Sequence, residues 1–114
     1  MYEPKKTSPG TFSPTHPGQV LRKMYLERLG LSVSTAAAAV GISRTNFSQF
    51  LNGRFSLTPE MAVRISRAFD TPPELWLMLQ MEYDLRRAEE RLRDTDIVRL
   101  VPSRADEDEQ KQDP

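Results

Sequence analysis

The stretch that decides the fold is residues 31–53, which read LSVSTAAAAVGISRTNFSQFLNG. Small or apolar side chains recur there every three or four residues, first at Val33, Ala36, Ala37 and Val40 and then at Phe47, Phe50 and Leu51. This spacing predicts two short amphipathic helices. Ser32 and Ser43 precede the two runs and suit N-caps, and Gly41 suits a left-handed stop. We therefore expect helices over residues 33–40 and 44–51.

The link between these helices is only Gly41-Ile42-Ser43, which forces the helix axes to cross steeply. The small Ala36 and Ala37 allow a close approach. Ile42 precedes the cap and is expected to reach Phe47, as a hydrophobic staple that fixes the entry angle of the second helix. This arrangement is the geometry of a helix-turn-helix.

The second helix presents a polar, acid-free face if its apolar residues point inward. We expect this face to contact DNA bases through Arg44, Thr45, Ser48 and Gln49. Arginine pairs with two acceptors of guanine, glutamine pairs in the same way with adenine, and hydroxyl groups serve either base edges or the backbone. The alternative is an ordinary polar helix face on an all-α domain.

A second set of residues is expected to hold the phosphate backbone of DNA without reading its sequence. It consists of residues at the start of the first helix and residues in and after the second helix: Ser34, Thr35, Asn46, Asn52, Arg54 and Ser56. Backbone N–H groups at the starts of both helices also point where a phosphate group binds well.

Three further helices complete an all-α, five-helix prediction in which no segment is a convincing strand. Residues 17–29 begin with Pro17 and end before Gly30, and residues 59–69 follow the cap Thr58. The last helix is predicted from residue 71 to about residue 93, with Thr71 and Glu74 as a capping box. His16 is expected to pack or cap at the first helix rather than to catalyse. Residues 97–101 form an apolar run whose conformation the sequence leaves open.

The last helix is apolar around much of its circumference, which predicts two buried faces. One face is expected to lie on the core and the other on a second subunit. The dimer interface is assigned to Met78, Met81, Leu85 and Leu92. A dimer would place two recognition helices about 34–36 Å apart on a pseudo-palindromic site. The alternative is a central core helix in a monomer.

Composition narrows the function further. The 114 residues include 16 Lys+Arg and 16 Asp+Glu, one His and no Cys, so disulfides, thiol chemistry and metal sites built on Cys or several His residues are excluded. We expect no cofactor, no bound metal, no membrane span and no enzyme, because neither a nucleophile–base pair nor a phosphate loop is present. We expect a cytoplasmic protein.

Charge and composition also divide the chain into three parts. Residues 1–14 are expected to be a disordered arm, 15–93 the DNA-binding and dimerisation domain, and 94–114 an acidic, largely disordered tail. Residues 15–58 carry five Lys or Arg against one acid, whereas residues 102–114 carry two against five acids. The tail is interpreted as a segment that wraps a basic partner, that repels non-specific DNA, or that only keeps the protein in solution.

Beyond these patterns, residues 31–53 resemble the Cro/repressor (XRE) helix-turn-helix. Three blocks, THPGQVLRKMYLERLGLS, LNGRFSLTPEMAVRISRAF and TPPELWLMLQMEYDLRRA, are similar to HigA-type antitoxins, and the similarity covers about residues 15–88. The resemblance implies a dimeric antitoxin that neutralises a basic, mRNA-cleaving toxin of the HigB/RelE type and represses its own operon on double-stranded DNA. The family usually has Gln, a phosphate contact, where this chain has Val33. Ser34 or Thr35 replaces that contact, or it is lost.

Two other functions compete with this interpretation. One is a stand-alone regulator of transcription without a toxin partner. The other is a protein-interaction domain that has lost DNA binding, which Val33 and the four consecutive alanines at residues 36–39 make conceivable.

Overall fold

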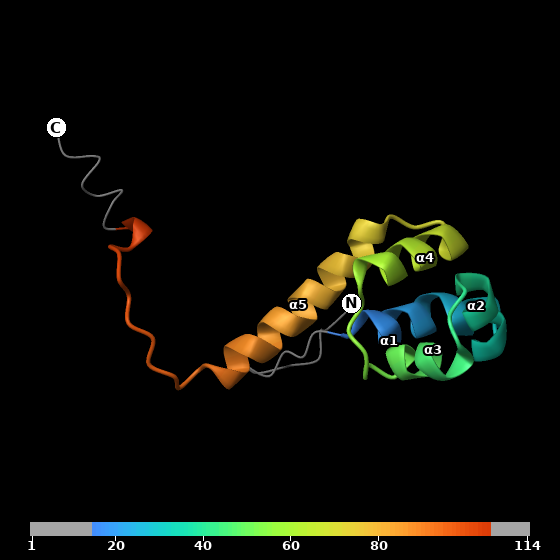
Figure 1. Ribbon diagram of the computed structural model, residues 1–114, viewed down its shortest axis with the longest axis horizontal. Helices are drawn as coiled ribbons and strands as arrows, with labels where there is room; N and C mark the ends of the chain where they lie inside the picture. The colour runs from blue at the N-terminus through green and yellow to red at the C-terminus, as the bar shows by residue number, and fades with distance from the viewer. Residues whose placement is uncertain (1–14, 106–114) are drawn as a thin grey trace, which may run out of the picture.

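The computed structural model describes residues 15–105, which form five α-helices and one π-helical segment and no strand. In chain order the elements are α1 (Pro17–Leu21), η1 (Arg22–Glu27), α2 (Val33–Val40), α3 (Arg44–Leu51), α4 (Pro59–Phe69) and α5 (Pro73–Arg91). The first four α-helices gather into a globule, and α5 leaves it as a long rod (Figure 1). The all-α, five-helix prediction is confirmed.

The core lies where α1, α3, α4 and α5 meet. Its largest fully buried side chains include Trp76, Phe47, Phe50, Leu21 and Ile65. Each comes from a different helix except the two phenylalanines, which both come from α3. The recognition helix is therefore anchored by two aromatic rings, whose burial typically contributes a few kcal/mol each.

The first helix differs from the prediction of a continuous α-helix over residues 17–29. It starts as α1 and continues as the π-helical η1 before a last helical turn at residues 28–29. Leu21 and Leu26 are both buried, at 0% and 3% exposure, and they are five residues apart. Residues five apart do not share a face of an α-helix, whereas i→i+5 bonding brings them onto one side. Burial of both leucines accounts for the wider turn.

The predicted capping box at the start of α5 is wrong. The helix begins at Pro73 with Pro72 as its N-cap, and that cap makes no side-chain hydrogen bond. The Thr71 hydroxyl instead accepts a hydrogen bond from the indole Nε1–H of Trp76 at 2.7 Å. Because Trp76 is fully buried, its donor needs a partner inside the protein. Two successive prolines also lack N–H groups, so the helix start has fewer donors to satisfy.

The two faces of α5 differ as the sequence predicted. Trp76 and Gln80 are buried against the globule. The opposite side carries a stripe of exposed apolar residues, Met78 (60% exposed), Met81 (56%), Leu85 (44%) and Leu92 (50%). We call these four residues the α5 stripe. Their place on α5 agrees with the predicted dimer interface, which itself remains a prediction.

Beyond α5 the described chain continues away from the globule to residue 105 (Figure 1). The predicted disordered arm, residues 1–14, and the acidic run Asp106–Glu109 lie outside the described residues. Among the helices of residues 15–105, none combines the length and apolarity of a membrane span. The same range holds no cluster of three or more metal-ligating side chains.

Candidate nucleic-acid interface

The turn between α2 and α3 is built as the sequence predicted. Ser32 Oγ accepts from Thr35 N–H at 3.0 Å, and Ser43 Oγ accepts from Asn46 N–H at 3.1 Å. Gly41 ends α2 with φ +81°, a conformation that costs glycine little. Both predicted caps and the left-handed stop are confirmed, so local chemistry fixes where the two helices begin and end.

Arg64, a cation from α4, also holds the turn. Arg64 Nη1 donates to the carbonyls of Val40 at 3.2 Å and Gly41 at 3.4 Å. Its Nε donates to Glu60 at 3.3 Å. Carbonyls at a helix C-terminus lack helical partners and attract positive charge. Arg64 therefore caps the C-terminal end of α2. The only indication of this role in the sequence is an arginine four residues after a glutamate.

The recognition helix α3 turns its apolar residues inward and its polar residues outward. Phe47, Phe50 and Leu51 are fully buried. The four predicted base contacts remain accessible: Arg44 and Thr45 are exposed, and Ser48 and Gln49 are half-buried. Thr45, Ser48, Gln49 and Asn52 follow one another at spacings of three, one and three, which places them on one side of the helix. No acidic residue occurs in α3, so this face can approach phosphate groups without like-charge repulsion.

All six predicted backbone contacts are exposed: Ser34, Thr35, Asn46, Asn52, Arg54 and Ser56. Thr35 Oγ1 also accepts a hydrogen bond from the Ser32 hydroxyl at 2.9 Å, which orients its side chain at the start of α2. Val33, which occupies the position where the resembling family usually has Gln, is half-buried and packs against the core. A phosphate at the start of α2 would therefore meet Ser34 and Thr35 rather than residue 33.

Arg22, in η1, lies beside the end of α3. Its Nη2 donates to Asn52 Oδ1 at 2.9 Å. This bond fixes the Asn52 amide and leaves its NH₂ group as a donor. The π-helical segment η1 thus carries a guanidinium to the end of the recognition helix. No pattern in the sequence linked residues 22 and 52.

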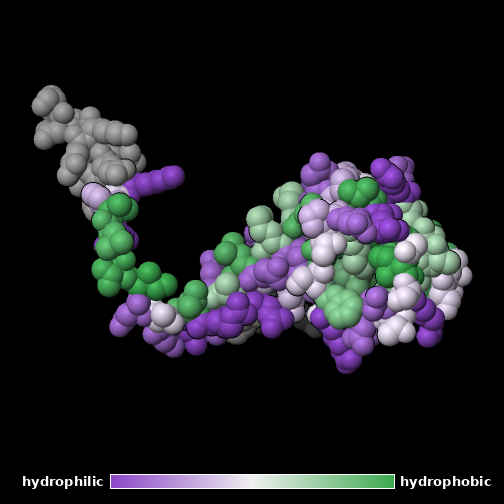
Figure 2. Space-filling model, in the orientation of Figure 1, coloured by the Kyte–Doolittle hydropathy of each residue, from purple (hydrophilic) through white to green (hydrophobic). Residues whose placement is uncertain are grey.

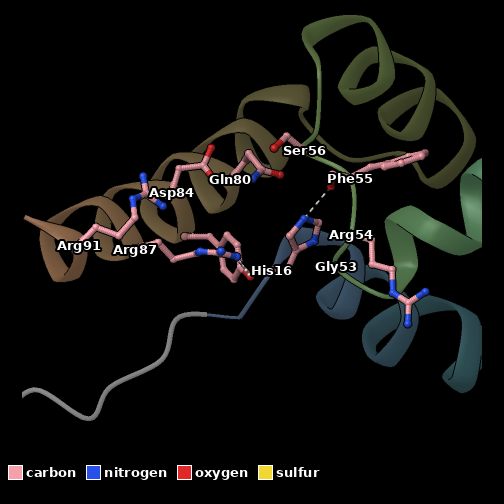
Figure 3. A pocket seen from close by; sticks show the side chains of 10 residues that line it. His16, Gly53, Arg54, Phe55, Ser56, Gln80, Asp84, Arg87 and Arg91 are labelled. Atoms are coloured by element: carbon pink, nitrogen blue, oxygen red, sulfur yellow. Dashed lines mark hydrogen bonds between the residues drawn. The ribbon is translucent and has the colours of Figure 1, made fainter.

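The loop that follows α3 is tied to α5 and to the start of α1. His16 Nε2–H donates to the Phe55 carbonyl at 2.8 Å, and Leu57 N–H donates to Gln80 Oε1 at 2.8 Å. These contacts border an open, polar pocket of about 280 Å³ between the loop and α5 (Figure 3). Arg54 extends from the loop away from the α5 side chains in that view. Arg54 and Ser56 are therefore carried on a loop with two fixed points.

His16 has a structural role, as the sequence predicted. It is 2% exposed, and its Nδ1 accepts from Gly18 N–H at 2.9 Å, so it caps α1. Burial lowers the pKa of the imidazole below its usual value, and the hydrogen bond to the Phe55 carbonyl opposes that shift in part. Both ring nitrogens are hydrogen-bonded, and the ring packs edge-on against Phe50 and Tyr83.

Comparison with known proteins identifies the family. A helix-turn-helix family model (HTH_3) matches residues 23–76. The transcriptional regulator YbaQ of Escherichia coli, described as an uncharacterised HTH-type regulator, is 39% identical over 83 residues, which cover 73% of this chain and 74% of YbaQ. The chain belongs to the Cro/repressor-type helix-turn-helix family, whose members are DNA-binding regulators and antitoxins rather than enzymes.

The HigA branch of this family is also represented. Antitoxin HigA-1 of Vibrio cholerae is 33% identical over 72 residues, which cover 63% of this chain and 68% of HigA-1. The antitoxin GraA in complex with its operator superposes with a TM-score of 0.73 and 36% identity, over 80% of this chain and 95% of GraA. The resemblance to HigA-type antitoxins is therefore confirmed in both sequence and fold.

Proposed function

We propose that this helix-turn-helix protein is an antitoxin that binds the operator of its own operon as a dimer and represses transcription in the cytoplasm. The observation that carries the proposal is the accessible, acid-free face of α3, which is held at a fixed angle by Ser43, Gly41 and Arg64. The likeness of the chain to the antitoxin GraA in complex with its operator supports DNA as the ligand.

In this proposal Arg44, Thr45, Ser48 and Gln49 contact base edges. Each bidentate contact of arginine or glutamine typically discriminates against a wrong base by about 1–3 kcal/mol. The exposed set Ser34, Thr35, Asn46, Asn52, Arg54 and Ser56 holds phosphates on either side. Loss of a base contact should relax sequence preference, whereas loss of a phosphate contact should weaken binding to every sequence by a similar factor.

A dimer doubles the number of contacts and matches a two-fold operator. We assign its interface to the α5 stripe, because Met78, Met81, Leu85 and Leu92 are exposed on the side of α5 opposite the buried Trp76 and Gln80. Exposed apolar surface of this extent along one helix is typical of a protein–protein interface. A second copy packed on this stripe would leave α3 free, since α3 lies in the globule and contributes no residue to the stripe (Figure 1).

The toxin part of the proposal is the neutralisation of a basic, mRNA-cleaving toxin of the HigB/RelE type. It is supported by the likeness to antitoxins HigA-1 and GraA. The acidic run Asp106–Glu109 gives the C-terminal end a charge opposite to that of an RNA-binding partner. A small basic reading frame beside the gene, and co-purification of its product, would support this part.

A gel-shift on the promoter of its own gene tests operator binding. Arg44→Ala and Gln49→Ala should each weaken specific binding by about 5- to 150-fold, since one bidentate base contact contributes about 1–3 kcal/mol. Arg67→Ala is the matched control, because Arg67 is an exposed arginine near the end of α4. Unchanged affinity in both α3 variants would refute the recognition face.

The second candidate is a stand-alone regulator without a toxin, which the likeness to the regulator YbaQ favours. Both candidates predict operator binding, so the gel-shift does not separate them. Co-expression of the neighbouring gene does: rescue of growth by this chain identifies an antitoxin, and a harmless neighbour identifies a stand-alone regulator.

A further inference from the structure

The open pocket of about 280 Å³ between α5 and the loop after α3 is lined by more cationic than acidic side chains (Figure 3). We call it the α5 pocket, and three arginines and one acid line it. Its loop side includes Arg54 and Ser56, and its α5 side includes Gln80, Asp84, Arg87 and Arg91. A concave surface with a surplus of arginine attracts an anionic ligand.

The ion pairs along α5 do not neutralise this surplus. The three glutamates in the second half of the helix all pair with arginines outside the pocket: Glu82 and Glu89 with Arg86 at 3.3 and 2.7 Å, and Glu90 with Arg93 at 3.2 Å. Across the described residues 15–105, Arg87 and Arg91 take part in no ion pair. Asp84, the acid of the pocket, accepts a hydrogen bond from Gln80 Nε2 at 2.9 Å. Two guanidinium groups therefore line the pocket without a paired carboxylate.

Arg87 is also held in place by a neighbour on the same helix. Its Nη1 donates to the Tyr83 hydroxyl at 2.8 Å, and its guanidinium carbon lies 5.3 Å from the centre of the Tyr83 ring. Arg87 and Arg91 are exposed, so their remaining N–H donors are accessible from outside. A planar guanidinium donates two parallel N–H bonds to phosphate oxygens. A phosphate group is therefore an anion that suits this pocket.

The α5 pocket and the α5 stripe lie on different sides of the helix. Gln80, Asp84, Arg87 and Arg91 follow one another at spacings of four, three and four residues, which places them on one side of α5. At 3.6 residues per turn, this side lies roughly 120° around the helix from the α5 stripe. Figure 2 shows hydrophilic residues along the lower edge of α5 and apolar residues along its upper edge. A second copy packed on the stripe therefore leaves the pocket open.

We propose that the α5 pocket binds a backbone phosphate of the operator between its two half-sites, through Arg87 and Arg91. This inference rests on the proposed function and extends its DNA surface from α3 to α5. Arg54 and Ser56 belong both to the pocket and to the proposed phosphate contacts, so DNA held by the loop passes the mouth of the pocket. In a dimer joined through the α5 stripe, α5 lies between the two recognition helices, which places the pocket over the DNA between the half-sites.

The shape of the pocket favours a phosphate of DNA over a free phosphate ion. Sites for small ligands bury most of the ligand surface, whereas Arg87 and Arg91 are exposed beside an open pocket. Arg54 extends away from the α5 side chains (Figure 3), so it is free to contact a neighbouring phosphate of the same strand. A row of separated cations is typical of a surface that follows a phosphate backbone.

The salt dependence of operator binding tests this site. In a dimer, Arg87→Gln/Arg91→Gln removes one phosphate contact from each copy, so the slope of log K against log salt should become shallower by about 2. The affinity ratio of wild type to this double variant should then be about ten-fold larger in 50 mM than in 200 mM salt. Arg86→Gln/Arg93→Gln is the matched control, because it removes the same charge from two arginines that pair with glutamates, and its slope should stay close to wild type.

Ethylation of single phosphates locates the contact on the DNA. Ethylated phosphates between the half-sites should interfere with binding of the wild-type chain and of the control, but not with binding of Arg87→Gln/Arg91→Gln. Thermal melting of the two double variants should be similar, since all four arginines are exposed. A loss of affinity with this pattern therefore reports a lost contact and not a damaged fold.

The outcomes separate the pocket from operator binding itself. Equal salt slopes and equal interference patterns in the two double variants would overturn the phosphate site and leave recognition by α3 standing. A wild-type chain that does not bind its promoter overturns the proposed function and this site with it. Inorganic phosphate, followed by phosphorus NMR, is the last probe. Phosphate binding that is lost in Arg87→Gln/Arg91→Gln, together with a wild-type salt slope for DNA, would assign the pocket to free phosphate and would also overturn the DNA contact.

Discussion

Gly18 packs directly against the backbone of the recognition helix. A Cβ atom at this position would lie 1.9 Å from the Phe50 carbonyl oxygen and 3.0 Å from Leu51 Cα. Both are backbone atoms of α3, so no side-chain rotation removes the clash. Normal contact needs about 3.5 Å, so Gly18→Ala would push the two helices apart by about 1.5 Å.

The size of the effect follows from two opposing terms. Overpacking of a well-packed interior typically costs about 1–3 kcal/mol or more. Alanine in place of glycine returns up to about 1 kcal/mol in a helix, and less in the first turn, where Gly18 lies. A net loss of about 1–2 kcal/mol lowers the melting temperature of a domain of this size by about 5–15 °C.

Thermal unfolding and operator binding together check the reasoning. We expect Gly18→Ala to melt lower and to bind promoter DNA at least about ten-fold more weakly even when folded, because α3 is displaced. Gly30→Ala is the control: Gly30 has φ +66° but open space around it, so this variant is strained without any push on α3. Wild-type melting and affinity in Gly18→Ala would refute the close-packing argument, and equal loss of affinity in both variants would refute displacement as its cause.

Three further predictions concern other fixed points of the fold. Burial lowers the pKa of His16 below its usual value; the charge of Asp84 opposes this shift and the charge of Arg87 adds to it. The unfolding free energy should therefore be steady above about pH 6.5 and fall as the pH drops below it. Urea titrations from pH 5 to 8 measure this free energy. His16→Asn, which keeps a cap, should flatten its dependence on pH. A wild-type protein that is more stable in acid would contradict a lowered pKa of His16. Arg64→Met should lower the free energy of urea unfolding by about 1 kcal/mol and weaken operator binding, because the end of α2 is loosened. Glu60→Gln should change neither quantity. Equal effects of the two variants would show that the Arg64–Glu60 ion pair matters rather than the bonds from Arg64 to the end of α2. Thr71→Val leaves the buried indole N–H of Trp76 unpaired and should lower the free energy of unfolding by about 1–3 kcal/mol. Thr71→Ser should be close to wild type when unfolding is followed by tryptophan fluorescence. Equal stability of the two variants would show that this hydrogen bond does not stabilise the fold.

Much of the interface could be predicted from the sequence because it is local. The caps Ser32 and Ser43 and the stop at Gly41 act within four residues of their own helix ends. The inward and outward faces of α3 follow from helical spacing alone. The position of His16 at the start of α1 was also predictable, since a side chain there reaches the first free N–H groups.

The capping box was wrong for a reason that no local pattern contains. Thr71 was assigned to the helix start because a Glu follows three residues later. Its hydroxyl instead bonds a tryptophan that is buried by the other helices. The competing partner existed only after the chain had folded, and an indole donor buried without a partner costs more than a missing cap.

The amino-acid sequence alone determined the helices, the orientation of the recognition face and the absence of any thiol chemistry, because each depends on residues close together in the chain or on composition. Only the tertiary structure decided that Arg64 closes α2, that Arg22 holds Asn52 and that the first helix widens at residues 22–27. The two contacts join residues more than twenty positions apart, and the widened helix depends on the packing of the whole core. The free energy that selects them arises when the helices meet, and no short stretch of sequence contains it.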